Sequence, residues 1–228
     1  AAKKGVRTLV GYNYPHHPVH AIAKARIDAG ELGDIVHARL SMNVDFLADP
    51  EGPFIWRCDK KMAGSGIIGD GAGHLFGFTQ YLIGDVAEVC GNLEIVVAER
   101  PAVEGAAVGR TVGPGEKRQM RTVDTDDSAQ VIMRFANGAT GIMDASRVHT
   151  GKKLEIGYDI VGTKGALSWS YDRMNELQTY DASDPVDRQG FKRIEVGPSH
   201  PYYGAFYPVP NLGFGYNDMK LVEVRKLV

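Results

Sequence analysis

The stretch GSGIIGDGAGH at positions 64–74 holds the residue pair whose types and spacing are best suited to chemistry. Asp70 and His74 are four residues apart, so on a helix their side chains would lie on one face. A carboxylate beside an imidazole can hold one tautomer of the ring and raise its basicity, which suits proton transfer. The pair predicts an acid/base site, and a core histidine bonded to Asp70 explains the spacing equally well.

The same stretch fits G-x-G-x-x-G over residues 64–69, the pattern of a dinucleotide phosphate loop. The preceding residues, WRCDKKMA, cannot end the buried parallel strand that such a loop follows. We therefore predict that this segment does not bind a pyrophosphate. On a helix over 66–83, the glycines would instead form one bare stripe, made by Gly66, Gly69, Gly73 and Gly77. A stripe without side chains admits another backbone or a flat ligand.

Metal and disulfide chemistry have little support in the sequence. D-x-x-x-H can chelate zinc, but no third or fourth ligand nearby has metal-site spacing, so we expect no metal. Cys58 and Cys90 have no C-x-x-C partner. They indicate reduced thiols and a cytoplasmic protein.

The composition is that of a globular chain with a core of its own. Hydrophobic residues make up 43% of the 228 residues and charged residues 24%, with a net charge of −2. No basic field attracts nucleic acid, and no apolar run approaches the roughly 20 residues of a membrane helix. We therefore expect neither a nucleic-acid partner nor a membrane.

The elements that must position Asp70 and His74 begin with a short strand over 6–12. A helix over 18–30 follows, with Pro18 at its first position and Gly30 after its end. Residues 35–46 alternate between apolar and polar types, which predicts a strand with one buried and one polar face. The helix over 66–83 comes next.

Most of the remaining chain is expected to be β-strand. Strands are predicted at 86–98, 128–135, 139–148, 153–161, 165–171, 176–181 and 192–196. Asn137-Gly138 predicts a hairpin turn, and a long loop is expected up to residue 126. A last helix is predicted over 217–228, capped by Asn217. This order indicates an α+β fold: a large open, mostly antiparallel (mixed) sheet with helices packed on one face.

Four longer segments resemble the Gfo/Idh/MocA oxidoreductases. WRCDKKMAGSGIIGDGAGHLFGFTQYLIGD is similar to that family's substrate-domain signature, with a Trp-Arg pair, a glycine cluster and D-x-G-x-H. VGYNYPHHP resembles its last Rossmann strand, and AGELGDIVHARL its helix-to-strand passage. SRVHTGKKLEIGYDIVGTKGALSWSYDRMNELQTY resembles the later sheet of its inositol-dehydrogenase-like and levoglucosan-dehydrogenase-like members.

The resemblance implies a division of the chain and a function. Residues 1–15 would be the last strand of a Rossmann domain whose phosphate loop and catalytic lysine are expected before residue 1. Residues 16–228 would form the substrate-binding and oligomerisation domain. The implied activity is hydride transfer between NAD or NADP and a secondary hydroxyl of a sugar or an inositol-like cyclitol. A homo-oligomer through the open sheet face is the expected assembly.

The resemblance also implies roles for single residues. Asp70 and His74 match the residues that contact the reacting hydroxyl, with His74 as proton acceptor or as part of a proton relay and Asp70 orienting it. Asn13 matches the residue near the nicotinamide. Tyr14, beside it in the sequence, is a further candidate that would stack near the nicotinamide or pack under it. Where family members often have Arg after Asn-x, this chain has Pro15.

Substrate-binding candidates are more scattered. Trp56 and Arg57 match the Trp-Arg pair that flanks the family's site, and Arg57 also suits a structural ion pair. Arg147, His149 and His200 are further candidates for hydrogen bonds to a polyol. A non-catalytic sugar-binding or oligomerisation module built on the same domain remains the alternative function.

Overall fold

The protein is built around one large mixed β-sheet. A computed structural model describes residues 2–103, 113 and 119–228. Eight strands pair in the order β10-β9-β8-β7-β1-β6-β5-β2. They are β1 (Ile35–Asn43), β2 (Val86–Glu94), β5 (Ser128–Phe135), β6 (Thr140–Ser146), β7 (Glu155–Gly162), β8 (Gly165–Ser170), β9 (Glu176–Asp181) and β10 (Lys192–Glu195). Of these pairings only β1–β6 is parallel. The predicted α+β class with a mostly antiparallel sheet is confirmed.

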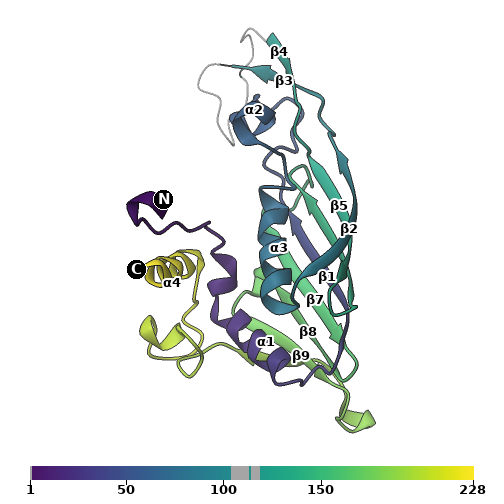
Figure 1. Cartoon of the computed structure of the whole chain (residues 1–228), viewed down its shortest axis with the longest axis vertical. Coiled ribbons are helices and arrows are strands. Elements are labelled where there is room, and N and C mark those ends of the chain that lie inside the picture. Colours follow the sequence, from purple (N-terminus) through teal and green to yellow (C-terminus); the bar gives the residue numbers. More distant parts are fainter. Residues whose placement is uncertain (1, 104–112, 114–118) are drawn as a thin grey trace.

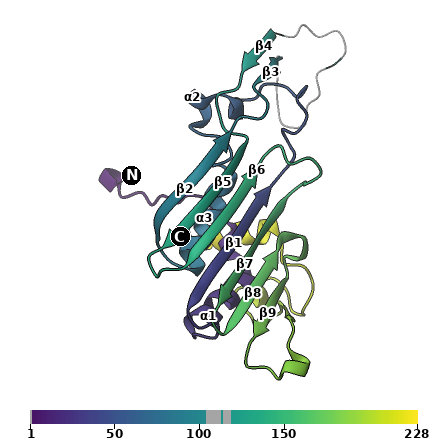
Figure 2. The ribbon, with the colours of Figure 1, turned by 90° about the vertical axis from the view of Figure 1, so that its right-hand side faces the viewer.

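The helices lie on one face of this sheet and leave the other open (Figures 1 and 2). Of these, α1 (Pro18–Asp28) and α3 (Gly71–Leu82) contact its strands, and α4 (Tyr216–Leu227) lies further out on the same side, against the turn Tyr14–His16. The helix side carries the main core, in which Leu40 of β1, Phe78 of α3 and Met143 of β6 are buried. Burial of such side chains stabilises the layer by roughly 1.5–3 kcal/mol each.

Local signals are confirmed where a helix end or a tight turn depends on them. Pro18 begins α1, and the imidazole of His17 accepts a hydrogen bond from the Val19 amide at 3.2 Å. Gly30 has a φ of +72°, the left-handed conformation that stops a helix. Gly138 has a φ of +89° in the hairpin that joins β5 to β6.

The alternation predicted for 35–46 is confirmed within β1 except at its start. Ala38, Leu40 and Met42 are buried. Val36 was expected on the same face but is 51% exposed, because the pairing register shifts between Ile35 and His37. The strand ends at Asn43, three residues before the predicted end.

The helix that carries His74 is shorter than predicted, which changes the glycine stripe. It begins at Gly71, so Gly66 and Gly69 lie in the loop before it. Of the four glycines, only Gly73 and Gly77 remain on the helix, and Tyr12 covers both. Its hydroxyl lies 3.1 Å from where a Cβ of Gly73 would be, and its ring lies 3.8 Å from that of Gly77. The expected bare stripe of four glycines is therefore wrong.

The segment between β2 and β5 is more regular than the expected long loop. It contains a separate two-stranded sheet of β3 (Glu99–Ala102) and β4 (Gln119–Thr122). Earlier in the chain, a short helix α2 (Lys60–Ala63), which was not predicted, precedes α3. The predicted strand over 86–98 ends at Glu94. Positions 104–112 and 114–118 of the predicted loop lie outside the described residues.

The two ends of the chain also differ from expectation. Residues 6–12 form no strand, and Val6, Leu9 and Val10 are at least half exposed. No other described strand pairs with this segment, so its backbone has no ladder to join. The C-terminal helix begins at Tyr216 with Gly215 as its N-cap, not Asn217, because the Asp218 carboxylate accepts from the Gly215 amide at 2.8 Å.

No helix in the described part of the chain combines the length and the apolar character needed to span a membrane.

Candidate functional site

An ion pair joins the two loops that the sequence singled out. Asp70 is the N-cap residue of α3, but its carboxylate makes no capping hydrogen bond. The Asp70 carboxylate instead accepts a hydrogen bond from Nε of Arg57 at 3.1 Å. The helix thereby forgoes the roughly 1 kcal/mol that a capping hydrogen bond would contribute, and the carboxylate pairs with Arg57 instead.

Arg57 lies in a 3₁₀ turn, Trp56–Cys58, and its guanidinium has an aromatic neighbour as well. It lies 4.4 Å from the centroid of the Trp56 ring, a cation–π distance. Trp56 itself is 53% exposed, so part of its ring is open to solvent beside the Arg57–Asp70 pair. The pair itself supports the structural-ion-pair interpretation of Arg57. It also brings Trp56, Arg57 and Asp70 together.

His74 lies one turn into α3 between two tyrosines. Its ring meets Tyr12 edge-on at 5.3 Å and Tyr14 at 4.9 Å between centroids. Burial lowers the pKa of the imidazole, and the Asp70 carboxylate partly opposes this shift. The ring is therefore neutral near pH 7 and able to accept a proton.

Asp70 does not orient His74 by a hydrogen bond, which corrects the expected pairing. The Nδ1 atom of His74 is buried and has no hydrogen-bond partner among the described residues. The carboxylate is directed to Arg57 instead. Asp70 acts on the imidazole through its charge, while the two tyrosine rings limit the movement of the imidazole.

Asn13 and Tyr14 reach the same place from the N-terminal segment. Asn13 is only 3% exposed, and its side-chain nitrogen has no partner within the described part of the chain. A buried amide donor without an acceptor is unusual and suits a ligand carbonyl. Burial raises the pKa of Tyr14, and nearby Tyr171, Tyr216 and Asp70 raise it further.

Sequence reasoning missed the tyrosines around this cluster. The Tyr14 ring contacts Tyr171 at 5.8 Å and Tyr216 at 6.1 Å between centroids. Tyr171 follows β8 and Tyr216 begins α4, so no local spacing connects them to Tyr14. The only available signal was their aromatic type.

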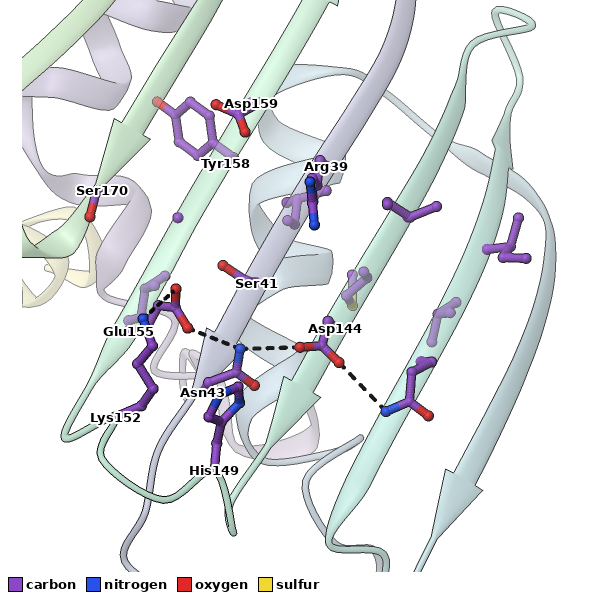
Figure 3. Close-up of a pocket in the computed structure, with 18 of the residues that line it drawn as sticks. Arg39, Ser41, Asn43, Asp144, His149, Lys152, Glu155, Tyr158, Asp159 and Ser170 are labelled. Atoms are coloured by element: carbon purple, nitrogen blue, oxygen red, sulfur yellow. Dashed lines mark hydrogen bonds and ion pairs between the residues drawn. The ribbon is translucent and has the colours of Figure 1, made fainter.

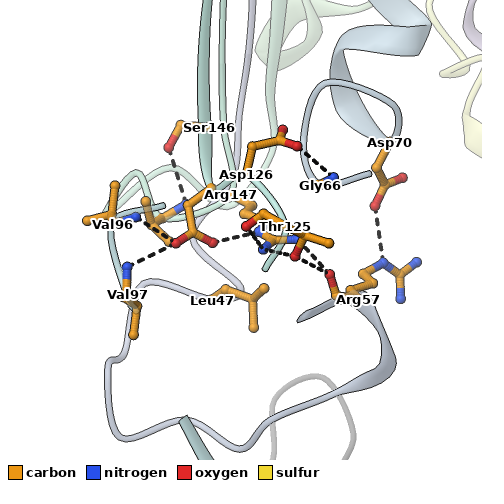
Figure 4. A network of polar contacts seen from close by, with 12 residues as sticks. Leu47, Arg57, Gly66, Asp70, Val96, Val97, Thr125, Asp126, Ser146 and Arg147 are labelled. Carbon is orange, nitrogen blue, oxygen red and sulfur yellow. Dashed lines mark hydrogen bonds and ion pairs between the residues drawn. The ribbon is translucent and has the colours of Figure 1, made fainter. Parts of the chain in front are cut away.

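Arg147 is a structural residue, which corrects its assignment to substrate binding. It is 2% exposed, and its Nε donates to the Asp127 carboxylate at 2.8 Å (Figure 4). Its two amino groups donate to the carbonyl of Arg57 and to Thr125. Four of its five N–H donors are thus used within the protein, and the buried guanidinium is not open to a sugar hydroxyl.

His149 and His200 are also not brought to His74. His149 lines a cavity of about 900 Å³ on the open face of the sheet, opposite the helices (Figure 3). The Nδ1 atom of His200 accepts from the Gly197 amide at 2.9 Å, in a turn near α4. The interactions described for either histidine do not connect it to Asp70 or His74, so both assignments lack support.

The glycine-rich loop is shaped by another backbone, not by a phosphate. The amides of Gly66 and Ile68 donate to the two oxygens of the Asp126 carboxylate, at 2.8 and 2.7 Å. Two of the N–H groups that a phosphate loop would offer are therefore occupied, which supports the exclusion of a pyrophosphate here. Within the described ranges no group of three or more His, Cys, Asp or Glu side chains could hold a metal, and both cysteines are free.

Comparison with known proteins gives consistent matches. The family model described as GFO/IDH/MocA C-terminal domain matches residues 20–168. The chain is 38% identical over 220 residues to levoglucosan dehydrogenase of Pseudarthrobacter phenanthrenivorans, which covers 96% of this chain and 56% of that protein. The chain therefore spans little more than half the length of this relative.

Solved structures agree with this match. Levoglucosan dehydrogenase in complex with NADH and levoglucosan superposes with a TM-score of 0.86 at 36% identity, covering 97% of this chain and 56% of the other. An inositol dehydrogenase homologue from Azotobacter vinelandii, complexed with NAD⁺, has a TM-score of 0.72 at 20% identity. It covers 92% of this chain and 50% of the other, and shows the shared fold alone.

Proposed function

We propose that this chain, which belongs to the GFO/IDH/MocA family through its C-terminal domain, is the substrate-binding part of an NAD(P)-dependent dehydrogenase. The substrate would be a sugar or related polyol with a secondary hydroxyl. The observation that carries the proposal is His74, an imidazole kept neutral by burial and bordered by Asp70, Tyr12 and Tyr14. Its similarity to levoglucosan dehydrogenase supports the substrate class.

His74 has the properties that a proton acceptor for such a reaction needs. A carbinol loses a proton from oxygen as it loses a hydride from carbon, so a neutral base must lie beside the hydroxyl. The Asp70 carboxylate would stabilise the imidazolium that forms. The half-exposed Trp56 would provide an apolar surface for the carbon face of a sugar ring.

The residues near His74 fit a nicotinamide cofactor. Asn13 has a buried side-chain nitrogen without an acceptor in the described residues, which a carboxamide oxygen would satisfy. When bound, NAD or NADP accepts or supplies the hydride. We expect Asn13→Ala to raise the KM for the cofactor about tenfold, the effect of one hydrogen bond, with the KM for the sugar unchanged. An unchanged cofactor KM would contradict this role.

We also propose that residues 1–15 pack against a nucleotide-binding domain in the whole protein. Val6, Leu9 and Val10 are exposed apolar residues in an extended segment, which a neighbouring sheet would bury and pair. A cytoplasmic location is supported by the free thiols of Cys58 and the exposed Cys90.

The catalytic proposal is tested by steady-state kinetics on the protein that carries this chain. A panel of sugars that includes levoglucosan and L-sorbose is assayed with NAD⁺ and NADP⁺, and reduced cofactor is followed by absorbance. His74→Ala should lower kcat by about 10²–10⁴-fold while circular dichroism stays unchanged. His37→Ala is the matched control, because His37 lies on the opposite face of the sheet and bonds Thr140.

Two results would contradict the catalytic role. Near-normal turnover of His74→Ala would exclude His74 as the base. Sugar binding by the wild-type protein without any turnover would favour the non-catalytic sugar-binding module.

We further propose that two copies associate through the open sheet face. Asn43 lines the cavity on this face, the one that His149 also lines, and its side-chain amide donates to Asp144 at 3.1 Å and to Glu155 at 3.0 Å (Figure 3). Arg39 and Asp159 are paired positions on β1 and β7, and neither side chain has a hydrogen bond or ion pair within the described chain. A two-fold contact would let Arg39 of each copy meet Asp159 of the other.

Sedimentation velocity tests this assembly. Arg39→Glu should shift the protein towards monomer, because it places like charges together across the contact. The charge swap Arg39→Glu with Asp159→Arg should restore association. A sedimentation coefficient that does not change in Arg39→Glu would contradict the proposed face.

A further inference from the structure

Three consecutive residues just before β5 hold both loops of the candidate site. Thr125, Asp126 and Asp127 follow the end of β4 and lie between the Trp56–Cys58 turn and the glycine-rich loop (Figure 4). They are far in sequence from both loops, and within the described residues no hydrogen bond or ion pair joins them to His74. Their hydrogen bonds nevertheless reach the residues on either side of the Arg57–Asp70 ion pair.

Asp126 binds the glycine-rich loop with all its oxygens. Its carboxylate accepts from the amides of Gly66 and Ile68, at 2.8 and 2.7 Å, and its carbonyl accepts from the Ile67 amide at 2.9 Å. The approach is so close that a Cβ on Gly66 would lie 1.9 Å from the Asp126 carbonyl oxygen. Gly66 is required here for close backbone contact.

The position of Gly66 determines that of Asp70. The carbonyl of Gly66 accepts a hydrogen bond from the Asp70 amide at 3.1 Å, so residues 66–70 form one closed turn. Gly69 fits this turn without a side chain, because a Cβ there would lie 2.0 Å from the Ser65 hydroxyl. A movement of the loop at Gly66 would therefore move the Asp70 carboxylate.

The other side of the ion pair is held by Thr125 and Arg147. The carbonyl of Arg57 accepts from the Thr125 hydroxyl at 2.8 Å and from Arg147 Nη1 at 3.0 Å. Arg147 is in turn fixed by the Asp127 carboxylate, which also accepts from the amides of Val96 and Val97. The backbone of Arg57 is thus tied to residues at the ends of β2, β5 and β6.

We propose that Asp126 is a positioning residue that sets the Asp70 carboxylate against Arg57 and beside His74, an inference that rests on the proposed function. Both members of the ion pair are attached to one rigid segment, Asp70 through Asp126 and Arg57 through Thr125. The glycine-rich loop then serves to hold the Asp70 carboxylate in place. A displacement of about 1 Å at a reacting centre can reduce turnover by about 10²-fold.

The test compares Asp126→Ala, Asp126→Asn and the wild type in the protein that carries this chain. The pKa of His74 is measured by NMR titration, because the Asp70 charge acts on this imidazole together with its burial between Tyr12 and Tyr14. Asp126→Ala should lower that pKa, and Asp70→Asn, added as a reference, should lower it too because it removes the charge that raises it. Asp126→Asn removes the same charge but keeps an acceptor for one of the two amides, so its titration should fall between those of Asp126→Ala and wild type.

Hydrogen exchange and kinetics complete the test. In Asp126→Ala the amides of Gly66 and Ile68 should exchange at least about tenfold faster, and kcat should fall by about 10²-fold with little change in KM. Asp181→Ala is the matched control, since the Asp181 carboxylate accepts a backbone amide in a turn at the far end of the sheet.

The outcomes separate this inference from the proposed function. A His74 pKa and a kcat that stay at wild-type values in Asp126→Ala would overturn the positioning role. Wild-type protein without dehydrogenase activity would overturn the proposed function, while the NMR titration would still decide whether Asp126 positions Asp70.

Discussion

The substitution Gly66→Ala gives the sharpest test of how the glycine-rich loop is built. The added Cβ would lie 1.9 Å from the Asp126 carbonyl oxygen, 2.5 Å from its nitrogen and 2.6 Å from its carbonyl carbon. All three are backbone atoms of Asp126, two residues before β5, so no side-chain rotation relieves the contact. The loop must therefore move away until the nearest contact reaches about 3 Å, an ordinary limit for packed atoms.

This movement has a cost that can be worked out from the contacts. A shift of about 1 Å stretches the hydrogen bonds from the Gly66 and Ile68 amides to Asp126 beyond bonding distance. Each part-buried amide left without a partner costs about 1–3 kcal/mol, and overpacking adds about 1–3 kcal/mol. We expect a loss of at least about 3 kcal/mol in the free energy of unfolding. In a chain of this length that lowers Tm by roughly 6–12 °C.

Urea unfolding followed by circular dichroism measures this loss. Gly190→Ala is the control, because a Cβ at Gly190 meets nothing within 4 Å. That variant should be neutral or slightly more stable, since alanine reduces the freedom of the unfolded chain by about 0.4–1 kcal/mol. If the two variants unfold within about 0.5 kcal/mol of each other, the close backbone contact at Gly66 is refuted.

Three further predictions concern the rest of the molecule. Arg147→Met leaves a buried carboxylate without its partner and should cost about 3–5 kcal/mol in urea unfolding, whereas Arg134→Met breaks an exposed pair and should cost less than about 1 kcal/mol. Burial lowers the pKa of His17 to about 4 and that of His20 well below its ordinary 6.5, so both are neutral in the folded state. As the pH falls from 6.5 towards 4, the unfolded chain binds protons on these histidines before the folded chain does, so the folded state loses stability. At pH 5.5 the free energy of unfolding should be about 1–3 kcal/mol lower than at pH 7.5. A urea midpoint that stays constant between pH 7.5 and 5 would contradict this. Gly138→Ala places a side chain at a φ of +89° and should lower the free energy of unfolding by about 1–2 kcal/mol. An unchanged Tm in thermal unfolding would contradict this strain.

Elements that depend on neighbouring residues were predictable from the sequence. Strand β9 matches its predicted range of 176–181, and Asn137-Gly138 forms the expected hairpin turn. In each case the signal and the structure lie within a few residues of each other. The predictions that were wrong, such as the strand over 6–12 and the start of α3, depended on distant partners. A strand needs a ladder partner, and the loop before α3 is shaped by Asp126.

The candidate site was predictable in part. Asp70, Trp56, Arg57, Asn13 and Tyr14 were named from sequence. In the structure Arg57 joins Trp56 to Asp70, and the Tyr14 ring contacts His74. The substrate-binding candidates outside these segments were chosen by residue type alone. Arg147 is buried in an ion pair, and His149 lies on the opposite face of the sheet.

The sequence by itself determined the class of fold and the family, and it supplied the candidate site residues, because these depend on local patterns and residue types. Only the tertiary structure decided what those residues do to one another. Asp70 pairs with Arg57 rather than capping α3 or bonding His74, and Gly66 serves close contact with Asp126 rather than a phosphate. The physical reason is that a side chain's partner depends on which distant segments folding brings within about 3 Å of it, and spacing along the chain does not contain that information.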